Sequence, residues 1–263
     1  MGRAGGLRGL QEEYTGTNPP AVISRIVATI KRSGTDGIGS AGDCLHLCNM
    51  EEKMTDAEKL AKEYDQEAED TGWLAPEIAF GLAYKYVSPG ESILDLGIGT
   101  GLGSVLFHKA GLHIYGMDIS NEMLDACRSK GFADCLKQHD LTVYPYPFAD
   151  MSIDHAICVG VLPFFNDLDR AFGEVSRILH RGGIFVFMTC HRDAAENSEI
   201  AVSAGPRDPN TKVTVYRHSA EQVKSWLVEN DFQLTQFIDF PMYLDNEKNS
   251  SLPCRIYLAG KVR

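Results

Sequence analysis

From residue 55 to the C-terminus, apolar positions switch repeatedly between the period of a strand and that of a helix. Thr55 and Glu58 form a Thr-x-x-Glu capping box before an amphipathic run over 57–68, and a second helical run over 76–86 begins with proline. Further helices are predicted over 102–110, 121–129, 168–179 and 220–229, and strands over 92–96, 113–117, 134–138, 153–159, 183–190, 232–240 and 255–260. This alternation predicts an α/β fold, a doubly wound and mostly parallel seven-stranded sheet with N-terminal helices.

Two segments do not fit this pattern. Residues 1–54 are rich in glycine and bury too little apolar surface to offset the entropy of ordering, so we expect a flexible, disordered extension before a single domain over 55–263. The extension could be a targeting segment, a linker or an artefact of start-site choice, with Met50 or Met54 as the physiological start. Residues 193–216 have neither period and predict a loop or a short hairpin over one edge of the strand ends.

Composition narrows the functional classes. Lys and Arg number 25 against 36 Asp and Glu, a net charge of −11, which excludes a nucleic-acid binder that relies on a basic surface. With 44% hydrophobic residues, no apolar run long enough to span a membrane and an odd number of scattered cysteines, the chain is expected to be a soluble, cytoplasmic protein. Cys44 and Cys48 flank His46, but a zinc site needs a fourth ligand, so no metal is expected.

A glycine loop follows the first predicted strand of the sheet. It reads Asp95-Leu-Gly97-Ile-Gly99-Thr-Gly101-Leu-Gly103, and such a loop lets a ligand approach the main chain closely. The dinucleotide fingerprint Gly-x-Gly-x-x-Gly/Ala fails in both registers, which disfavours the rival interpretation of a nicotinamide-dependent oxidoreductase. What is left is Asp-x-Gly-x-Gly-x-Gly.

That pattern resembles motif I of the class I methyltransferases that use S-adenosylmethionine (SAM). Asp118 ends the second strand, where that family keeps an acid on the ribose hydroxyls, and His139-Asp140-Leu141 follows the third strand, where the family contacts adenine. Residues 150–159 and 179–185 are similar to the family's later motifs. Tyr64-Asp65 is similar to a pair found before motif I in the small-molecule, type 11 or Williams-Beuren-region methyltransferase-like group.

The resemblance implies a Rossmann-like class I fold, SAM as cofactor and S-adenosylhomocysteine (SAH) as product. Carried over to this sequence, it predicts cofactor contacts from the front helices, the glycine loop and the ends of the next strands. The predicted residues are Tyr64, Trp73, Asp95, Gly97, Gly99, Gly101, Asp118, Ile119, Met123, Asp140, Leu141, Val159 and Gly160. Taken singly, Asp118 could instead cap a helix, and Tyr64 and Trp73 could simply pack the front helix on the sheet.

The methyl acceptor should lie beside the loops after the fourth and fifth strands of the sheet. Val161-Leu162-Pro163-Phe164 stands where enzymes that methylate exocyclic amines carry Asn/Asp-Pro-Pro-aromatic, so we expect a small, partly hydrophobic acceptor held by Leu162 and Phe164. After the fifth strand, His191 is a candidate general base and Arg192 a candidate clamp for a substrate carboxylate. Both could equally be ordinary residues of a solvated loop.

The sequence therefore predicts a SAM-dependent methyltransferase acting on a small molecule by in-line methyl transfer. Two alternatives stay open, a SAM-binding regulatory protein without transferase activity and a protein methyltransferase whose acidic surface attracts basic tails. No nucleic acid or membrane is expected as a partner, and the chain is expected to be a monomer or a homodimer.

Overall fold

The computed structural model describes residues 54–193, 195–203, 212–242 and 252–262. The predicted extension over 1–54 therefore lies, except for its last residue, outside the described residues. Within the described part of the chain, no helix is long and apolar enough to cross a membrane.

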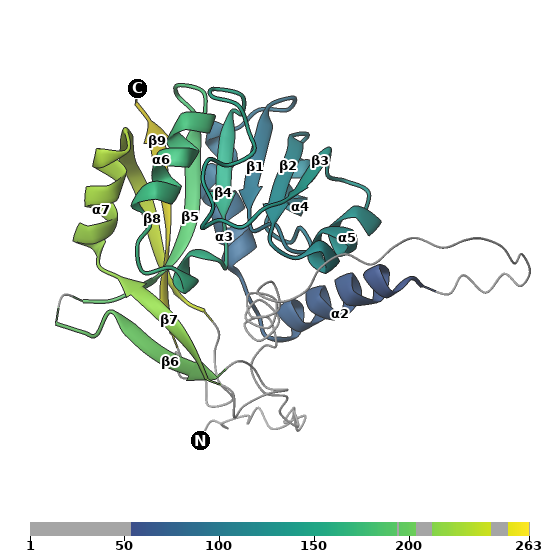
Figure 1. Ribbon diagram of the computed structural model, residues 1–263, viewed down its shortest axis with the longest axis horizontal. Helices are drawn as coiled ribbons and strands as arrows, with labels where there is room; N and C mark the ends of the chain where they lie inside the picture. The colour runs from purple at the N-terminus through teal and green to yellow at the C-terminus, as the bar shows by residue number, and fades with distance from the viewer. Residues whose placement is uncertain (1–53, 194, 204–211, 243–251, 263) are drawn as a thin grey trace, which may run out of the picture.

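The described strands form one nine-stranded sheet (Figure 1). Its parallel part has the order β3-β2-β1-β4-β5, and β9 and then β8 continue it in antiparallel pairing beyond β5. The strands are β1 (Ser92–Leu96), β2 (His113–Asp118), β3 (Cys135–Gln138), β4 (His155–Cys158), β5 (Ile184–His191), β6 (Glu199–Ser203), β7 (Lys212–His218), β8 (Phe232–Pro241) and β9 (Pro253–Lys261). The order reverses between β1 and β4, which in an open α/β sheet is where ligands bind.

Helices cover both faces of the sheet, as Figure 1 shows. One apolar core joins the sheet to α3 (Ala75–Ala83), α4 (Val105–Lys109) and α5 (Asn121–Ser129), and the other joins it to α6 (Asp169–Ile178) and α7 (Ala220–Glu229). The two cores alternate along β5: Val186 and Met188 point to the first, Phe185 and Phe187 to the second. Both faces of β5 are therefore buried, as expected for a strand whose residues are apolar at nearly every position.

The first helix lies apart from these two layers. Helix α2 (Asp56–Asp70) begins at the predicted capping box, because the Thr55 side chain accepts from the Glu58 amide and the Glu58 carboxylate accepts from the Thr55 amide. It packs mainly against α5, and Figure 1 shows it below the sheet, beyond the ends of β1 and β2.

The seven predicted strands and the alternating helices are confirmed, and the structure adds two strands. β6 and β7 pair as an antiparallel hairpin within the segment for which a loop or short hairpin was predicted. The end of β7 pairs in parallel with the end of β5, through Cys190 with Arg217 and His191 with His218. In Figure 1 this hairpin projects below the sheet, on the side where α2 lies.

One predicted boundary was wrong for a physical reason. The helix expected over 102–110 begins only at Val105, because the glycine loop continues as turns through Ser104. Apolar residues within the glycine-rich turn have the spacing of a helix, so the hydrophobic pattern predicted a helix that began too early.

Candidate cofactor and acceptor site

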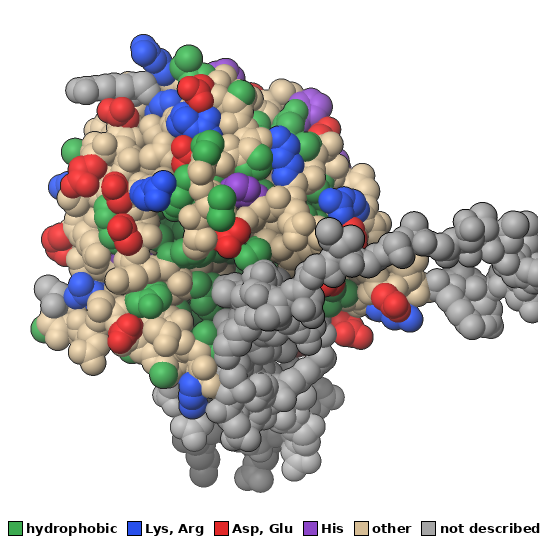
Figure 2. All heavy atoms as spheres, in the orientation of Figure 1, with side chains coloured by type: hydrophobic (Ala, Val, Ile, Leu, Met, Phe, Trp, Pro, Cys, Tyr) green, Lys and Arg blue, Asp and Glu red, His purple; other side chains and the backbone are tan. Residues whose placement is uncertain are grey.

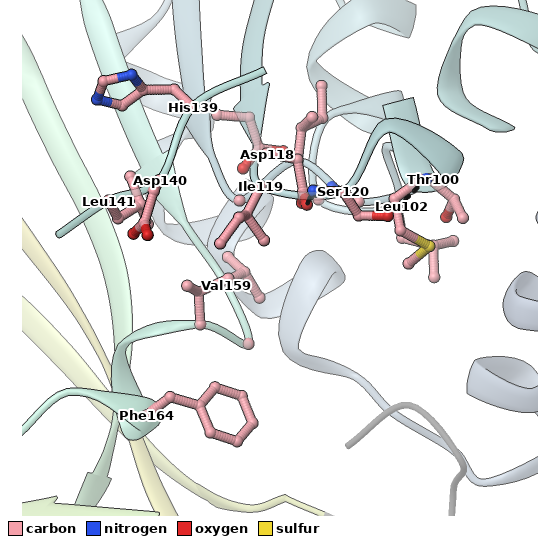
Figure 3. Close-up of a pocket in the computed structure, with 18 of the residues that line it drawn as sticks. Thr100, Leu102, Asp118, Ile119, Ser120, His139, Asp140, Leu141, Val159 and Phe164 are labelled. Carbon is pink, nitrogen blue, oxygen red and sulfur yellow. Dashed lines mark hydrogen bonds between the residues drawn. The ribbon is translucent and has the colours of Figure 1, made fainter. Parts of the chain in front are cut away.

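A cavity of about 300 Å³ lies at the carboxyl ends of β1, β2 and β4, beside α2, whose Tyr64 contributes to the lining. All of the predicted cofactor residues line it except Gly101. Figure 3 shows how the lining is arranged: Thr100 and Leu102 lie at one end, Asp140 and Leu141 at the other, and Asp118 and Ile119 between them. Val159 and Phe164 approach from a separate side, so the cavity has an arm that runs past Asp118 and a second, apolar end.

The glycine loop turns sharply over the end of β1. Gly97 has φ +75°, and its amide donates to the Met117 carbonyl at 2.8 Å, which holds the loop against β2. A Cβ at this position would lie 2.4 Å from Cγ2 of Val161, in the loop after β4. Gly97 is therefore required twice, for its backbone conformation and for the close approach of two loops.

Asp118 connects the end of β2 to the glycine loop. Its Oδ2 accepts from the Gly99 amide at 2.9 Å, and its Oδ1 accepts from the Ser120 amide at 2.9 Å. Burial raises the pKa of the Asp118 carboxyl, and these amide hydrogen bonds act in the opposite direction. The helix-cap interpretation of Asp118 was wrong, because Ser120 caps α5 by accepting from the Met123 amide at 3.2 Å.

Asp95 lies deeper, at the start of the glycine loop, and is 2% exposed. Its Oδ2 accepts from the Ser104 hydroxyl at 2.6 Å. Burial raises the pKa of the Asp95 carboxyl to about 7, and the negative charge of Asp118 adds to the shift. The cavity thus contains a carboxyl group poised to change charge near neutral pH.

Helix α2 is fastened to the glycine loop through Asp65. The Asp65 carboxylate accepts from the Thr100 hydroxyl at 2.7 Å and forms an ion pair with Lys130 at the end of α5. This places the neighbouring Tyr64, which is 5% exposed, against Met123 in the wall of the cavity. The sequence pointed to Tyr64 and Asp65 but carried no signal for Thr100 or Lys130 as the partners.

The arm of the cavity beyond Asp118 ends at a turn after β3. The Asp140 carboxylate accepts from the amide and the hydroxyl of Thr142, both at 2.8 Å, which fixes the turn. Nε2 of His139 lies 2.8 Å from the Val143 carbonyl, and Figure 3 shows the imidazole on the outer side of this end. Asp140 and Leu141 are left facing the cavity, where the resemblance placed the adenine contacts.

The second end of the cavity is apolar. Val161, Phe164 and Phe165 line it from the segment after β4, and Figure 3 shows the Phe164 ring pointing into it from the short helix η2 (Leu162–Phe164). Across from them, the Trp73 indole packs on Gly160, where a Cβ would lie 3.0 Å from the ring. The Nε1 atom of Trp73 is buried and has no hydrogen-bond partner among the described residues.

Four predicted residues do not line this cavity. Gly101 faces the Phe132 ring instead, and Leu162 is 3% exposed in the core beneath α6. The Arg192 guanidinium donates to the main-chain carbonyls of Arg217 at 3.2 Å and Glu196 at 3.3 Å, so it braces the start of the β6–β7 hairpin.

His191, the fourth, is the candidate base. Side chains alternate along β5, so His191 shares the face of Phe187, which packs beneath α6, whereas Val159 and Trp73 belong to the opposite core. Its Nε2 lies 3.8 Å from the Asp193 carboxylate, its nearest recorded acidic partner. The structure therefore gives the predicted catalytic role of His191 no geometric support.

Part of the chain is similar to known methyltransferases. Residues 94–187 match the model of a methyltransferase domain family. A malonyl-[acyl-carrier protein] O-methyltransferase of Erwinia billingiae is 29% identical over 57% of each chain, and an arsenite methyltransferase of Halobacterium salinarum is 29% identical over 59% of this chain and 43% of its own. The chain thus spans about half the length of the curated relatives it matches.

Solved structures share the fold at lower sequence identity. A SAM-dependent methyltransferase from Methanosarcina mazei superposes with a TM-score of 0.58 at 18% identity, covering 69% of this chain and 97% of its own. The [4+2]-cyclase SpnF superposes with a TM-score of 0.56 at 17% identity, covering 76% of this chain and 83% of its own. The fold alone is therefore shared by proteins named for different reactions.

Proposed function

We propose that this chain carries a class I SAM-dependent methyltransferase domain, and that the whole protein binds SAM and transfers the methyl group to a small-molecule acceptor. The observation that carries the proposal is the placement of Asp118. Its carboxylate lies partly buried in the wall of the cavity and is already fixed by two amides, and each oxygen keeps a lone pair for a ribose hydroxyl.

The residues present suit this cofactor chemically. SAM supplies an electrophilic methyl carbon on a sulfonium centre and also carries an α-ammonium group. The cavity holds three carboxyl groups, those of Asp95, Asp118 and Asp140, and no lysine or arginine side chain of the described residues lines it. An acidic wall stabilises a cation and disfavours the phosphates of a dinucleotide. We assign Asp118 to the ribose, Asp140 and Leu141 to adenine, and Tyr64 and Asp95 to the methionine portion.

The apolar end would receive the acceptor. Trp73, Val161, Phe164 and Phe165 can hold an acceptor of similar character close to the methyl group and keep water out, which is where in-line transfer gains most. A carboxylate acceptor is disfavoured, because the described lining offers it no cation. The acceptor named for the malonyl-[acyl-carrier protein] relative is therefore not carried over to this chain.

The same end contains no evident general base among the described residues. His139 lies at the adenine end, and His191 does not line the cavity. We therefore propose an acceptor atom that already presents a lone pair at neutral pH, such as a thiolate, a neutral amine or a stabilised carbanion. Such an atom needs proximity and alignment rather than proton removal.

Calorimetric titration with SAM, SAH and NAD, followed by transfer from methyl-labelled SAM to a panel of neutral thiols, amines and phenols, tests this function. We expect binding of SAM and SAH, no binding of NAD, and labelled product from those thiols that are ionised and those amines that are unprotonated at the assay pH. Binding of NAD in place of SAM and SAH would refute the cofactor assignment.

One observation favours a second candidate function, that of a SAM-binding protein without transferase activity. The acceptor end lacks a described acid or base, and the fold is also that of a cyclase. This candidate predicts tight SAM binding with no labelled product from any acceptor, including thiolates that react without assistance.

A further inference from the structure

His218 joins the β6–β7 hairpin to the segment that lines the acceptor end. It is the last residue of β7, paired with His191 of β5, and its side chain is buried at 1% exposure. The imidazole Nε2 lies 3.0 Å from the main-chain carbonyl oxygen of Phe165. Its ring also meets the Trp226 indole edge-on, with centroids 5.4 Å apart and planes at 68°.

The direction of this hydrogen bond follows from its partner. A carbonyl oxygen can only accept, so the imidazole must carry its proton on Nε2 and leave a lone pair on Nδ1. Burial lowers the pKa of His218 to about 4, which keeps the ring neutral at neutral pH. Nδ1 is buried and has no hydrogen-bond partner among the described residues, so this ring is anchored through Nε2, which faces the main chain of Phe165 and Asn166.

The Phe165 carbonyl terminates a tight turn. Within that turn the Phe164 amide donates to the Val161 carbonyl at 3.1 Å and the Phe165 amide donates to the Leu162 carbonyl at 3.0 Å. The Leu162 side chain is buried in the core beneath α6 and holds one side of the turn. His218 holds the other side, because the carbonyl after the last turn has no partner within η2.

The turn presents its aromatic side chains to the cavity. Phe164 and Phe165 both line the acceptor end, and Figure 3 shows the Phe164 ring directed into it. A shift of the Phe165 carbonyl would displace both rings, because they are consecutive residues on one short turn. The two anchors therefore determine the shape of the apolar wall.

We propose that His218 is a positioning residue for the acceptor: its hydrogen bond to the Phe165 carbonyl sets the place of Phe164 and Phe165 and makes the β6–β7 hairpin part of acceptor selection. This inference rests on the proposed function, since it concerns the acceptor end of the same cavity. It does not require His218 to touch the acceptor or to move a proton.

The same hairpin offers a matched control. Val215 is also buried, at 2% exposure, but it packs in the opposite core, with Val186 and Met188 of β5. Val215→Ala removes buried apolar contacts from β7 without altering the contact to Phe165. A general loosening of the hairpin would therefore affect both variants, whereas loss of the positioning bond would affect only His218 variants.

The test uses N-phenyl-1-naphthylamine, a neutral apolar dye whose emission rises in apolar surroundings, titrated with and without saturating SAH. We expect His218→Leu to weaken dye binding by about 10-fold, the upper range for one hydrogen bond, with SAH affinity changed less than about twofold. His218→Gln, which carries an N–H donor near the Nε2 position, should recover binding to within about threefold of the wild-type value. Val215→Ala should bind the dye like the wild type.

Several results would overturn the inference. The inference fails if His218→Leu binds the dye as tightly as the wild type, or if Val215→Ala loses as much dye affinity as His218→Leu. It also fails if His218→Leu loses SAH affinity in parallel, or if the wild type does not bind the dye. Failure of methyl transfer in the labelled assay counts against the proposed function alone, because the dye titration without SAH reports the apolar wall independently of the reaction.

A second readout uses Trp226 as a reporter in a Trp73→Phe background, where it is the only tryptophan left of the two. Protonated imidazole quenches an adjacent indole, so emission should fall with a midpoint near pH 4, and His218→Gln should abolish this step. Arg192 and Asp167 are the charged groups that also act on His218. Burial lowers this pKa and the hydrogen bond to the Phe165 carbonyl raises it, so a midpoint near 6.5, the ordinary value, would show that the ring is not buried as described.

Discussion

The two ends of the cavity are built in different ways. The cofactor end is made largely by one continuous loop and the tips of two adjacent strands, and its polar groups are fixed by short hydrogen bonds such as Gly99 to Asp118 at 2.9 Å. The acceptor end is assembled from Trp73, the η2 segment and, through His218, the inserted hairpin. At the cofactor end few residue types can make the required hydrogen bonds, whereas many combinations of apolar residues can form the wall of the acceptor end.

In the space-filling view of Figure 2, hydrophobic side chains gather near the middle of the face shown, and charged side chains lie mainly around them. An apolar, water-excluding end beside a polar cofactor arm suits a reaction that needs alignment more than proton transfer.

Gly97→Val should break both ends at once. The new Cβ would lie 2.4 Å from Val161 at a positive φ, so the glycine loop and the segment after β4 must separate. We expect loss of measurable SAH binding, which calorimetry measures, and a lower melting temperature, which thermal denaturation measures. Gly81→Ala is the matched control, because a Cβ there meets nothing within 4 Å, and it should bind SAH normally. Normal SAH affinity in Gly97→Val would show that this contact is dispensable.

Asp118→Ala should affect the cofactor end alone. Loss of the charge-assisted hydrogen bonds to the ribose should weaken SAH binding by about 10- to 100-fold, while N-phenyl-1-naphthylamine still binds the acceptor end. Asp134→Ala serves as control, because Asp134 likewise accepts from a main-chain amide, that of Ile114 in β2 at 2.8 Å, and does not line the cavity. Equal SAH affinity in both variants would remove Asp118 from the cofactor site.

Asp95 gives the cofactor end a pH dependence near neutral pH. Its folded pKa, about 7, is raised above the ordinary value, so this group makes folding less favourable as pH rises from about 4 to 7. A bound cation favours the carboxylate, so SAM binding should release a proton and strengthen by roughly tenfold from pH 6 to pH 8. Titrations in buffers of different ionisation enthalpy measure the proton, and Asp95→Asn should remove both effects. Proton uptake, or no pH dependence, would contradict this assignment.

Phe164→Ala should give the smallest change, confined to the acceptor end. Removing one ring of an apolar wall should weaken binding of N-phenyl-1-naphthylamine by about 3- to 10-fold and leave SAH affinity within about twofold. Phe237→Ala, at a ring that is 47% exposed on β8, is the control and should change neither affinity. A larger effect on SAH than on the dye would mean that Phe164 belongs to the cofactor end.

These contrasts explain what could be predicted from the sequence. Gly97 and Asp118 could be identified because a tight turn and a strand-end carboxylate leave a local pattern. The strand boundaries could also be predicted, because each strand is a short, continuous apolar run.

The acceptor end could not be predicted to the same depth. His218 and Phe165 lie 53 residues apart, and their contact depends on how an inserted hairpin pairs with the end of β5. Val161 and Phe165 line the cavity because η2 turns back on itself, which no periodic pattern records. Such contacts depend on tertiary packing rather than on local sequence.

A crystal structure of the protein with SAH tests the central claim most directly. We predict density for one SAH molecule in the described cavity, with the ribose hydroxyls on the Asp118 carboxylate, adenine beside Asp140 and Leu141, and the sulfur directed toward Trp73 and Phe164. SAH bound elsewhere, or in this cavity with the ribose away from Asp118, would contradict the account.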